Sequence, residues 1–230
     1  DITFLRKNYH FDEEFLEYLL KLSLNIDVWS VEEGTPVFAN EPLVTIRGTT
    51  VQAQIIETLL LICINYPTLV TTKAARIVYA SKGRAVMEFG ARRAQGIDAS
   101  LEGARGAVIA GCVGTSNSLA GQIYSVPVSG TIAHSYIQLH ESEYDALLNY
   151  CKVNPTNTTL LVDTYDTLKS GVPNAIRVAK EYLIPNGQKL NGIRLDSGDL
   201  AYLSNKARIM LDEAGLQSTK IIASNSLDEY

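Results

Sequence analysis

Cysteine is scarce in this chain, and its distribution limits the class of protein. The 230 residues include three cysteines, Cys63, Cys112 and Cys151, which lie far apart in apolar surroundings and form none of the close pairs that bind metals. An odd, unpaired set of this kind is typical of reduced thiols in a cytoplasmic protein. We therefore expect a cytoplasmic protein with free thiols.

Clustered positive charge is also missing. The 20 Lys and Arg residues are scattered, and the 25 Asp and Glu residues give a net charge of −5. Because surfaces that follow nucleic-acid phosphates need clustered basic residues, we expect no nucleic-acid partner. Individual phosphate contacts are compatible with this charge.

Long apolar segments are missing as well. The most apolar run, 55–64, contains Glu57 and is much shorter than the roughly 20 residues that span a membrane. Charged residues occur throughout 1–20, unlike in a secretory signal peptide. We expect no membrane association. Since the chain begins at Asp1 without a methionine and stops soon after a strand-like segment, we also expect it to be a piece of a longer protein.

Residues 1–48 predict a small module of helix and antiparallel strands. Apolar residues recur at helical spacing over 12–24. Three short β-type runs follow, at 28–31, 35–39 and 43–46. Turn residues at such close spacing are typical of antiparallel strands. Two further helices are predicted at 52–64 and 68–81, and we place a domain boundary after Gly48, so that 49–230 form the second domain.

From residue 84 onward, predicted strands and helices alternate. The strands are 85–89, 127–131, 158–162, 192–195 and 220–224. The helical segments between them are 99–110 with 116–124, then 142–150, 174–183 and 200–214. Such alternation predicts a parallel sheet in an α/β protein, either doubly wound or a barrel.

Polar residues after every predicted strand favour the barrel. They are Arg92 after the first strand, Thr131 and His134 after the second, Asp163 and Tyr165 after the third, Arg194 and Asp196 after the fourth, and Ser224 and Asn225 after the fifth. A barrel collects such residues at one face, where its chemistry takes place, whereas a flat sheet collects them mainly at one switch point. We therefore expect an irregular (β/α) barrel that is incomplete in this chain, because five units do not close a ring of eight.

The segment after the fourth strand has the chemistry of a phosphate site. Arg194 precedes a turn that contains Asp196, Ser197 and Gly198, and a helix then begins. Free N–H groups at a helix N-terminus suit a phosphate or diphosphate, and a carboxylate there can accept from a sugar diol or hold Mg²⁺. The alternative is that Ser197 or Asp199 only caps the helix.

His134 has the most plausible chemical setting of the three histidines. Asp163, at the end of the next strand, can orient its imidazole, fix its tautomer and raise its nucleophilicity. A lone histidine is otherwise ordinarily a hydrogen-bonded core residue. Asp166 is expected to cap the following helix.

Two further segments allow both a functional and a structural interpretation. Phe89 can stack on a flat ring and Arg92 can clamp a phosphate, or they are a core residue and a solvent-facing residue. Residues 111–117 can form a backbone anion site, or Thr115 or Ser116 can cap a helix.

Taken together, five segments resemble the nicotinate phosphoribosyltransferase family. They are 87–96 (MEFGARRAQG), 114–121 (GTSNSLAG), 130–135 (GTIAHS), 161–167 (LVDTYDT) and 193–200 (IRLDSGDL). The resemblance implies an irregular α/β barrel preceded by part of an α+β open-faced sandwich domain, in a homodimer. It also implies that nicotinate and phosphoribosyl diphosphate are converted to nicotinate mononucleotide and diphosphate, with Mg²⁺ and coupled to ATP hydrolysis, for NAD biosynthesis.

The same resemblance implies roles for individual residues. His134 corresponds to the histidine that ATP phosphorylates, and Asp163 to its supporting acid. The implied nicotinate-binding residues are Phe89, Ser116, Thr131 and Arg194. The phosphoribosyl diphosphate site is assigned to Arg92, Arg194, Asp196, Ser197, Gly198, Ser224 and Asn225, with Asp196 also the candidate Mg²⁺ ligand.

Ser116 predicts nicotinate rather than nicotinamide as substrate. Related nicotinamide-using enzymes carry Asp there, which accepts from the amide but would repel a carboxylate, whereas serine can donate to one. A nicotinamide-using enzyme and a non-catalytic phosphoribosyl- or nucleotide-binding protein remain the alternatives. The resemblance also places some site residues outside 1–230, so we do not expect this piece alone to be a complete enzyme.

Overall fold

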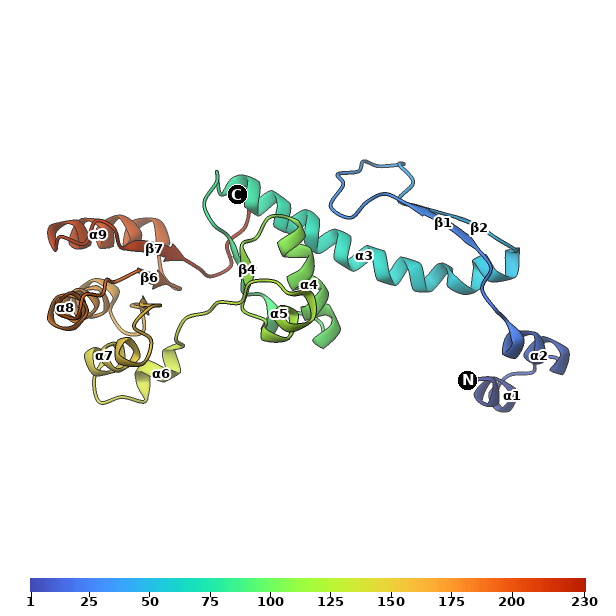
Figure 1. Cartoon of the computed structure of the whole chain (residues 1–230), viewed down its shortest axis with the longest axis horizontal. Coiled ribbons are helices and arrows are strands. Elements are labelled where there is room, and N and C mark those ends of the chain that lie inside the picture. The colour runs from blue at the N-terminus through green and yellow to red at the C-terminus, as the bar shows by residue number, and fades with distance from the viewer. The chain divides into compact units, whose positions relative to one another are not determined.

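The computed structural model describes all residues from 1 to 230, and the chain divides into two compact units, Asp1–Pro127 and Val128–Tyr230. Figure 1 shows the elements of each unit in chain order. The predicted boundary after Gly48 concerns the domains of the complete protein and stays a prediction.

The first unit contains helices, two short ladders and a 3-10 turn. Its elements are α1 (Ile2–Asn8), α2 (Glu13–Lys21), β1 (Asp27–Ser30), β2 (Val44–Arg47), α3 (Thr50–Ala80), β3 (Met87–Glu88), the 3-10 turn Ala91–Arg93, α4 (Ile97–Ile109), β4 (Gly114–Thr115) and α5 (Ser118–Tyr124). β1 and β2 pair antiparallel, as predicted. The run 35–39, predicted as a strand, is a loop instead; Pro36 has no N–H to donate to a ladder, which disfavours pairing there.

One long helix replaces the two that were predicted. α3 runs without a break through Pro67, although proline removes one helical hydrogen bond. α4 packs closely at this place, since a Cβ on Gly106 would lie 2.5 Å from Oγ1 of Thr71. The hydroxyl of Tyr66 also donates to the carbonyl of Ala99 at 3.0 Å. Packing against α4 therefore supports a helix that the local proline rule would have ended.

The continuity of α3 changes the argument about membranes. By length and composition, α3 is long and apolar enough to cross a membrane, and 6% of its most apolar window is buried. The expectation from the sequence considered only the apolar run 55–64, whereas the helix that contains this run is longer, so the absence of membrane association stays a prediction. Length and composition alone do not distinguish a membrane span from a helix that packs inside a larger soluble protein.

The second unit is an open α/β layer. Its elements are α6 (His134–Gln138), α7 (Glu143–Val153), β5 (Thr159–Leu161), the π-helical turn Thr167–Gly171, α8 (Val172–Val178), a second π-helical turn Ala179–Leu183, the 3-10 turn Ile184–Asn186, β6 (Gly192–Leu195), α9 (Leu200–Glu213) and β7 (Lys220–Ala223). The strands β5, β6 and β7 are parallel and adjacent in that order. No closed barrel forms, which agrees with the prediction of an incomplete α/β domain.

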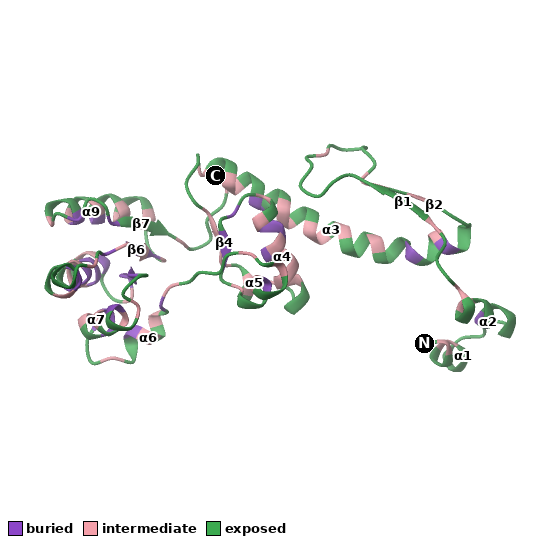
Figure 2. Ribbon diagram, viewed as in Figure 1, coloured by how far each residue is buried: buried purple, intermediate pink, exposed green.

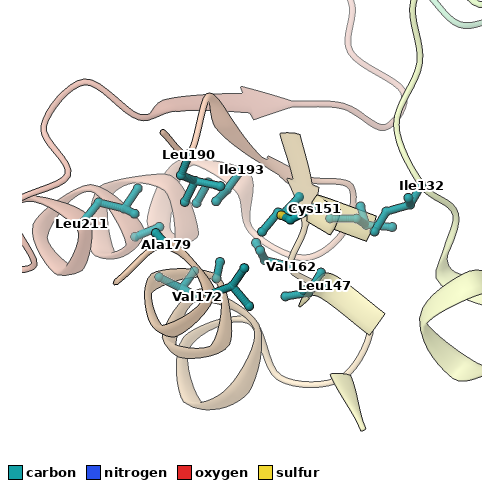
Figure 3. Packing of buried hydrophobic residues seen from close by; sticks show 14 of the residues in the cluster. Ile132, Leu147, Cys151, Val162, Val172, Ala179, Leu190, Ile193 and Leu211 are labelled. Atoms are coloured by element: carbon teal, nitrogen blue, oxygen red, sulfur yellow. The ribbon is translucent and has the colours of Figure 1, made fainter. Parts of the chain in front are cut away.

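A contiguous apolar core holds this layer together. Figure 2 shows buried residues in α7, α8 and the sheet, and Figure 3 shows how Leu147, Val172, Ile193 and Leu211 meet between helices and strands. These four side chains are fully buried. Burying a Leu, Ile or Val side chain contributes about 1.5–3 kcal/mol, so the core is large enough to fix the strand ends that carry the polar residues.

The segment 127–131 is not the strand that was predicted. It has one isolated β-bridge, at Val128, and the chain then enters α6 at His134. Pro127 has no N–H to donate, and Gly130 has no side chain to pack, so this short run has little to hold it in a ladder. Thr131 and His134 are therefore presented by a loop and a helix start rather than by a strand end.

Candidate active site

Arg194, near the end of β6, is the centre of the polar cluster in the second unit. Its guanidinium donates from Nη1 to Oγ1 of Thr131 at 2.7 Å, from Nε to Oγ of Ser224 at 2.8 Å, and from Nη2 to Oδ1 of Asp196 at 2.9 Å. The side chain is 13% exposed. One side chain thus brings together residues from three separate segments, two of them at the ends of β6 and β7 and one, Thr131, in the loop before α6.

Asp196 is the negative group of the cluster. Its Oδ1 accepts from Arg194 and also from the Ser224 hydroxyl at 2.5 Å. Burial by itself would raise the pKa of this carboxyl, but the hydroxyl of Ser224, the charge and hydrogen bond of Arg194, and the contact with His134 outweigh it, so the pKa lies below its usual value. Asp196 is therefore a carboxylate at neutral pH.

His134 lies at the rim of the same cluster, with its side chain 40% exposed. Nε2 is 3.5 Å from Oδ2 of Asp196. Nδ1 lies 3.0 Å from Oγ1 of Thr164, the residue after Asp163. The imidazole is thus contacted on both ring nitrogens by groups from the loops after β5 and β6.

Asp163 does not make the predicted contact with His134. Its buried carboxylate accepts, through Oδ2, from the backbone N–H of Asp196 at 2.8 Å and from the hydroxyl of Ser197 at 2.6 Å, while Oδ1 has no hydrogen-bond partner. Asp163 is therefore held by the turn after β6, and Thr164 faces the imidazole where Asp163 was expected.

The turn after β6 combines both interpretations offered by the sequence. Asp199 caps α9 by accepting from the N–H of Tyr202 at 2.9 Å, so that part is structural. Ser197 is not the cap, because its hydroxyl donates to Asp163. Gly198 has a φ of +74°, a conformation that favours glycine.

Asn225, after β7, has a φ of 98°, and its side-chain oxygen accepts from Ser226 rather than joining the Arg194 cluster.

In the first unit, Phe89 and Ser116 follow two paired strand ends. The register of β3 and β4 pairs Glu88 with Thr115, and the N–H of Ser116 donates to the carbonyl of Glu88 at 3.0 Å. Phe89 is half-buried and Ser116 is exposed. Arg92 is exposed in the 3-10 turn that follows. All three residues thus follow the paired ends of β3 and β4 in the first unit.

Two contact residues were not identified from the sequence. One is Thr164, and the other is Glu88, whose carboxylate accepts from the Thr115 hydroxyl at 2.6 Å and from the N–H of Gly90. A carboxylate inside an otherwise apolar strand was the signal that could have identified Glu88. The predicted helix caps, Thr115 and Ser116, do not cap α5. Asn117 is the cap, because its side-chain oxygen accepts from the N–H groups of Leu119 and Ala120.

The donor atoms do not make a closed metal site. No group of three or more His, Cys, Asp or Glu side chains is placed to hold an ion. Asp196 is the carboxylate that contacts Arg194, and its Oδ1 is already shared by Arg194 and Ser224. Magnesium commonly uses one or two carboxylates together with substrate phosphates and waters, and Asp196 fits that limited role.

The chain is similar to the proteins of one family. Residues 1–65 match the family model of the nicotinate phosphoribosyltransferase N-terminal domain, and residues 84–228 match that of the nicotinate phosphoribosyltransferase family. A Bacillus subtilis nicotinate phosphoribosyltransferase is 50% identical over 232 residues, which cover 100% of this chain and 46% of that protein. A Mycobacterium tuberculosis nicotinate phosphoribosyltransferase is 44% identical over 229 residues, which cover 100% of this chain and 49% of that protein.

A solved structure gives the same result for the fold. Human nicotinic acid phosphoribosyltransferase matches with a TM-score of 0.91 and 30% identity over 100% of this chain and 57% of the human chain. The chain thus spans about half the length of the curated relatives it matches.

Proposed function

Because this chain belongs to the nicotinate phosphoribosyltransferase family, we propose that the whole enzyme transfers the phosphoribosyl group of phosphoribosyl diphosphate to nicotinate. The products are nicotinate mononucleotide, for NAD biosynthesis, and diphosphate. ATP hydrolysis is coupled to the transfer through phosphorylation of His134, and the enzyme works as a cytoplasmic homodimer.

The observation that carries the proposal is the cluster around Arg194. As the bond between C1 of the ribose and the diphosphate lengthens, negative charge gathers on the leaving group, and a pre-positioned cation stabilises it. Arg194 supplies such a cation, and the hydroxyls of Thr131 and Ser224 lie beside it. Asp196 is an acceptor for ribose hydroxyls, and the turn at Ser197 and Gly198 offers backbone N–H groups to phosphate oxygens.

The acceptor ring would be bound by Phe89 and Ser116, which follow the paired strands β3 and β4. Phe89 offers an aromatic face for a flat ring. The Ser116 hydroxyl can donate to the carboxylate of nicotinate, and the exposed Arg92 offers a second guanidinium to the diphosphate. These assignments rest on the family positions of the three residues and on their exposure or half-burial.

Mg²⁺ would reach the site on the diphosphate of the substrate, with Asp196 as the one protein carboxylate to contact it. There it would supply positive charge to the phosphate oxygens.

The test is an assay of the full-length enzyme with nicotinate or nicotinamide, with and without ATP, that measures mononucleotide and diphosphate. We expect nicotinate to be used and ATP to be consumed in proportion. His134→Ala should lose ATP coupling and acid-labile phosphate while retaining slow transfer. His140→Ala is the matched control, because His140 bonds the Tyr136 carbonyl, away from the cluster.

Three results would contradict the proposal. Preference for nicotinamide would overturn the substrate assignment. Binding of phosphoribosyl diphosphate without any diphosphate release would indicate a binding protein. Full ATP stoichiometry in His134→Ala would remove the assigned role of that histidine.

A further inference from the structure

The contacts of His134 show that two consecutive residues have different tasks. Thr164 touches the imidazole at Nδ1, with 3.0 Å between Oγ1 and the ring nitrogen. Asp163 touches the turn after β6 instead, where it accepts from Asp196 and Ser197. The hydroxyl of Thr164 makes no other hydrogen bond, so His134 is its partner.

We propose that Thr164 is the positioning residue of His134: it holds the ring by Nδ1 and so directs Nε2 toward Asp196. Asp163 then holds the turn after β6, at Asp196 and Ser197, and does not hold the imidazole. The consequence for phosphorylation rests on the proposed function, in which ATP phosphorylates His134. The contact between Thr164 and His134 does not depend on that function.

A hydroxyl is suited to this task in a way that a carboxylate is not. It can donate to a bare Nδ1 or accept from a protonated one, whereas a carboxylate only accepts. Thr164 can therefore keep the ring in place whichever nitrogen carries the proton. When the proton is on Nδ1 and is donated to Thr164, Nε2 carries no proton and its lone pair is available for attack, while Asp196, 3.5 Å away, loses the proton that Nε2 could offer it.

The position of the phosphoryl group follows from this geometry. The Nε2 lone pair attacks the γ-phosphorus of ATP, the N–P bond forms, and the bond from phosphorus to the ADP oxygen breaks, with ADP as the leaving group. The proton stays on Nδ1, so no other acid or base is needed in this step. The phosphate should then be found on Nε2 alone.

Asp163 is placed to fix the turn that receives the sugar diphosphate. The backbone close to it is held by tight packing, because a Cβ on Gly171 would lie 1.7 Å from the carbonyl oxygen of Val162. From this fixed point, one carboxylate oxygen binds the N–H of Asp196 and the hydroxyl of Ser197. Removing its charge should therefore weaken phosphoribosyl diphosphate binding without freeing the imidazole.

The experiment compares Thr164→Val, Thr164→Ser and Asp163→Asn in the full-length enzyme. Valine has the shape of threonine without the hydroxyl, and serine restores the hydroxyl. The first measurement is ¹⁵N NMR of histidine-labelled protein, in which the His134 signals are identified by their loss in His134→Gln. The second is the isomer of phosphohistidine formed from γ-labelled ATP, separated after alkaline hydrolysis.

We expect the ¹⁵N shifts of His134 to change in Thr164→Val and to stay near wild type in the other two variants. Phosphoenzyme should fall about tenfold in Thr164→Val, the order of magnitude of one lost hydrogen bond, and should be a mixture of Nε2 and Nδ1 isomers. Thr164→Ser should give the Nε2 isomer alone. Asp163→Asn should also keep it, while KM for phosphoribosyl diphosphate rises several-fold.

Unchanged ¹⁵N shifts in Thr164→Val, or phosphate on Nδ1 in the wild type, would overturn the proposal. So would a mixture of isomers in Asp163→Asn. The NMR comparison uses no ATP, so it tests the contact of Thr164 even if the wild type forms no phosphoenzyme, a result that would contradict the proposed ATP coupling instead.

Discussion

Ser116 is tied to Glu88 by a hydrogen bond of 3.0 Å from its backbone N–H to the carbonyl of Glu88. Because this bond continues the ladder of β3 and β4, the position of Ser116 is set by backbone pairing and not by its own side chain. The hydroxyl of Ser116 is therefore free to be exchanged by mutation without moving the residue. This makes Ser116 a suitable place to test substrate choice.

Ser116→Asp should reverse or abolish the preference for nicotinate. Two carboxylates about 4 Å apart repel by about 4 kcal/mol at an effective dielectric constant of about 20, or roughly three decades in affinity, an upper value that solvent would reduce. The measurement is kcat/KM for nicotinate and nicotinamide in the full-length enzyme. Ser116→Ala is the control, since it removes the donor without adding charge. A Ser116→Asp enzyme that still prefers nicotinate would contradict the assignment.

Gly171→Ala should be strongly destabilising. A methyl group there would lie 1.7 Å from the carbonyl oxygen of Val162, so the π-helical turn or β5 must move. We expect a loss of more than about 3 kcal/mol, because overpacking in a well-packed core typically costs about 1–3 kcal/mol and here the clash is with backbone. Thermal unfolding measures it. Gly130→Ala, where nothing lies within 4 Å, should have little effect.

Arg194→Lys should impair the site although it keeps the charge. The guanidinium reaches Thr131, Ser224 and Asp196 at once, and a lysine cannot reproduce that fork. We expect weaker phosphoribosyl diphosphate binding, by about tenfold or more, from the loss of charged hydrogen bonds of about 1.5–3 kcal/mol. Titration calorimetry is the measurement. Arg177→Lys, on the exposed face of α8, serves as the control, and equal affinities in both variants would remove the central role of Arg194.

Cys151 should resist alkylation until the solution is strongly basic. Burial raises the pKa of its thiol to about 11. Because of the raised pKa, the folded protein keeps the thiol proton up to a higher pH than the unfolded chain does. The contribution of this thiol to the free energy of unfolding is therefore complete below the ordinary thiol pKa and is lost as the pH rises toward 11. Mass spectrometry after brief iodoacetamide treatment at pH 8 should find Cys63, which is exposed, labelled before Cys151. Rapid labelling of Cys151 in folded protein would contradict its burial.

The parallel strands of the second unit could be predicted because their signals are local. β6 has the bounds that were predicted, 192–195, and β5 and β7 lie within the predicted runs. Asp166 caps the next turn as expected, accepting from two backbone N–H groups. Apolar runs, caps and turn residues act over a few positions, so the sequence alone reveals them.

Features that depend on distant contacts could not be predicted. Pro67 signals a helix end, but packing of α4 overrides it. Order along the chain places the loop after β5 near His134, yet it does not tell which of two consecutive side chains will face the ring, and Thr164 does so rather than Asp163. The assigned roles of the site residues stay predictions until the variants are measured.

Arg194 has a carboxylate beside it before any anionic ligand arrives, because Asp196 lies 2.9 Å from the guanidinium. A diphosphate that approaches must therefore share or replace this resident counter-ion. The affinity at this position is then set by the difference between the Arg194–ligand ion pair and the Arg194–Asp196 ion pair. A ligand with less negative charge than a diphosphate gains little by displacing Asp196. In the proposed function, the charge pair would therefore favour phosphate esters that carry more than one negative charge over those that carry less.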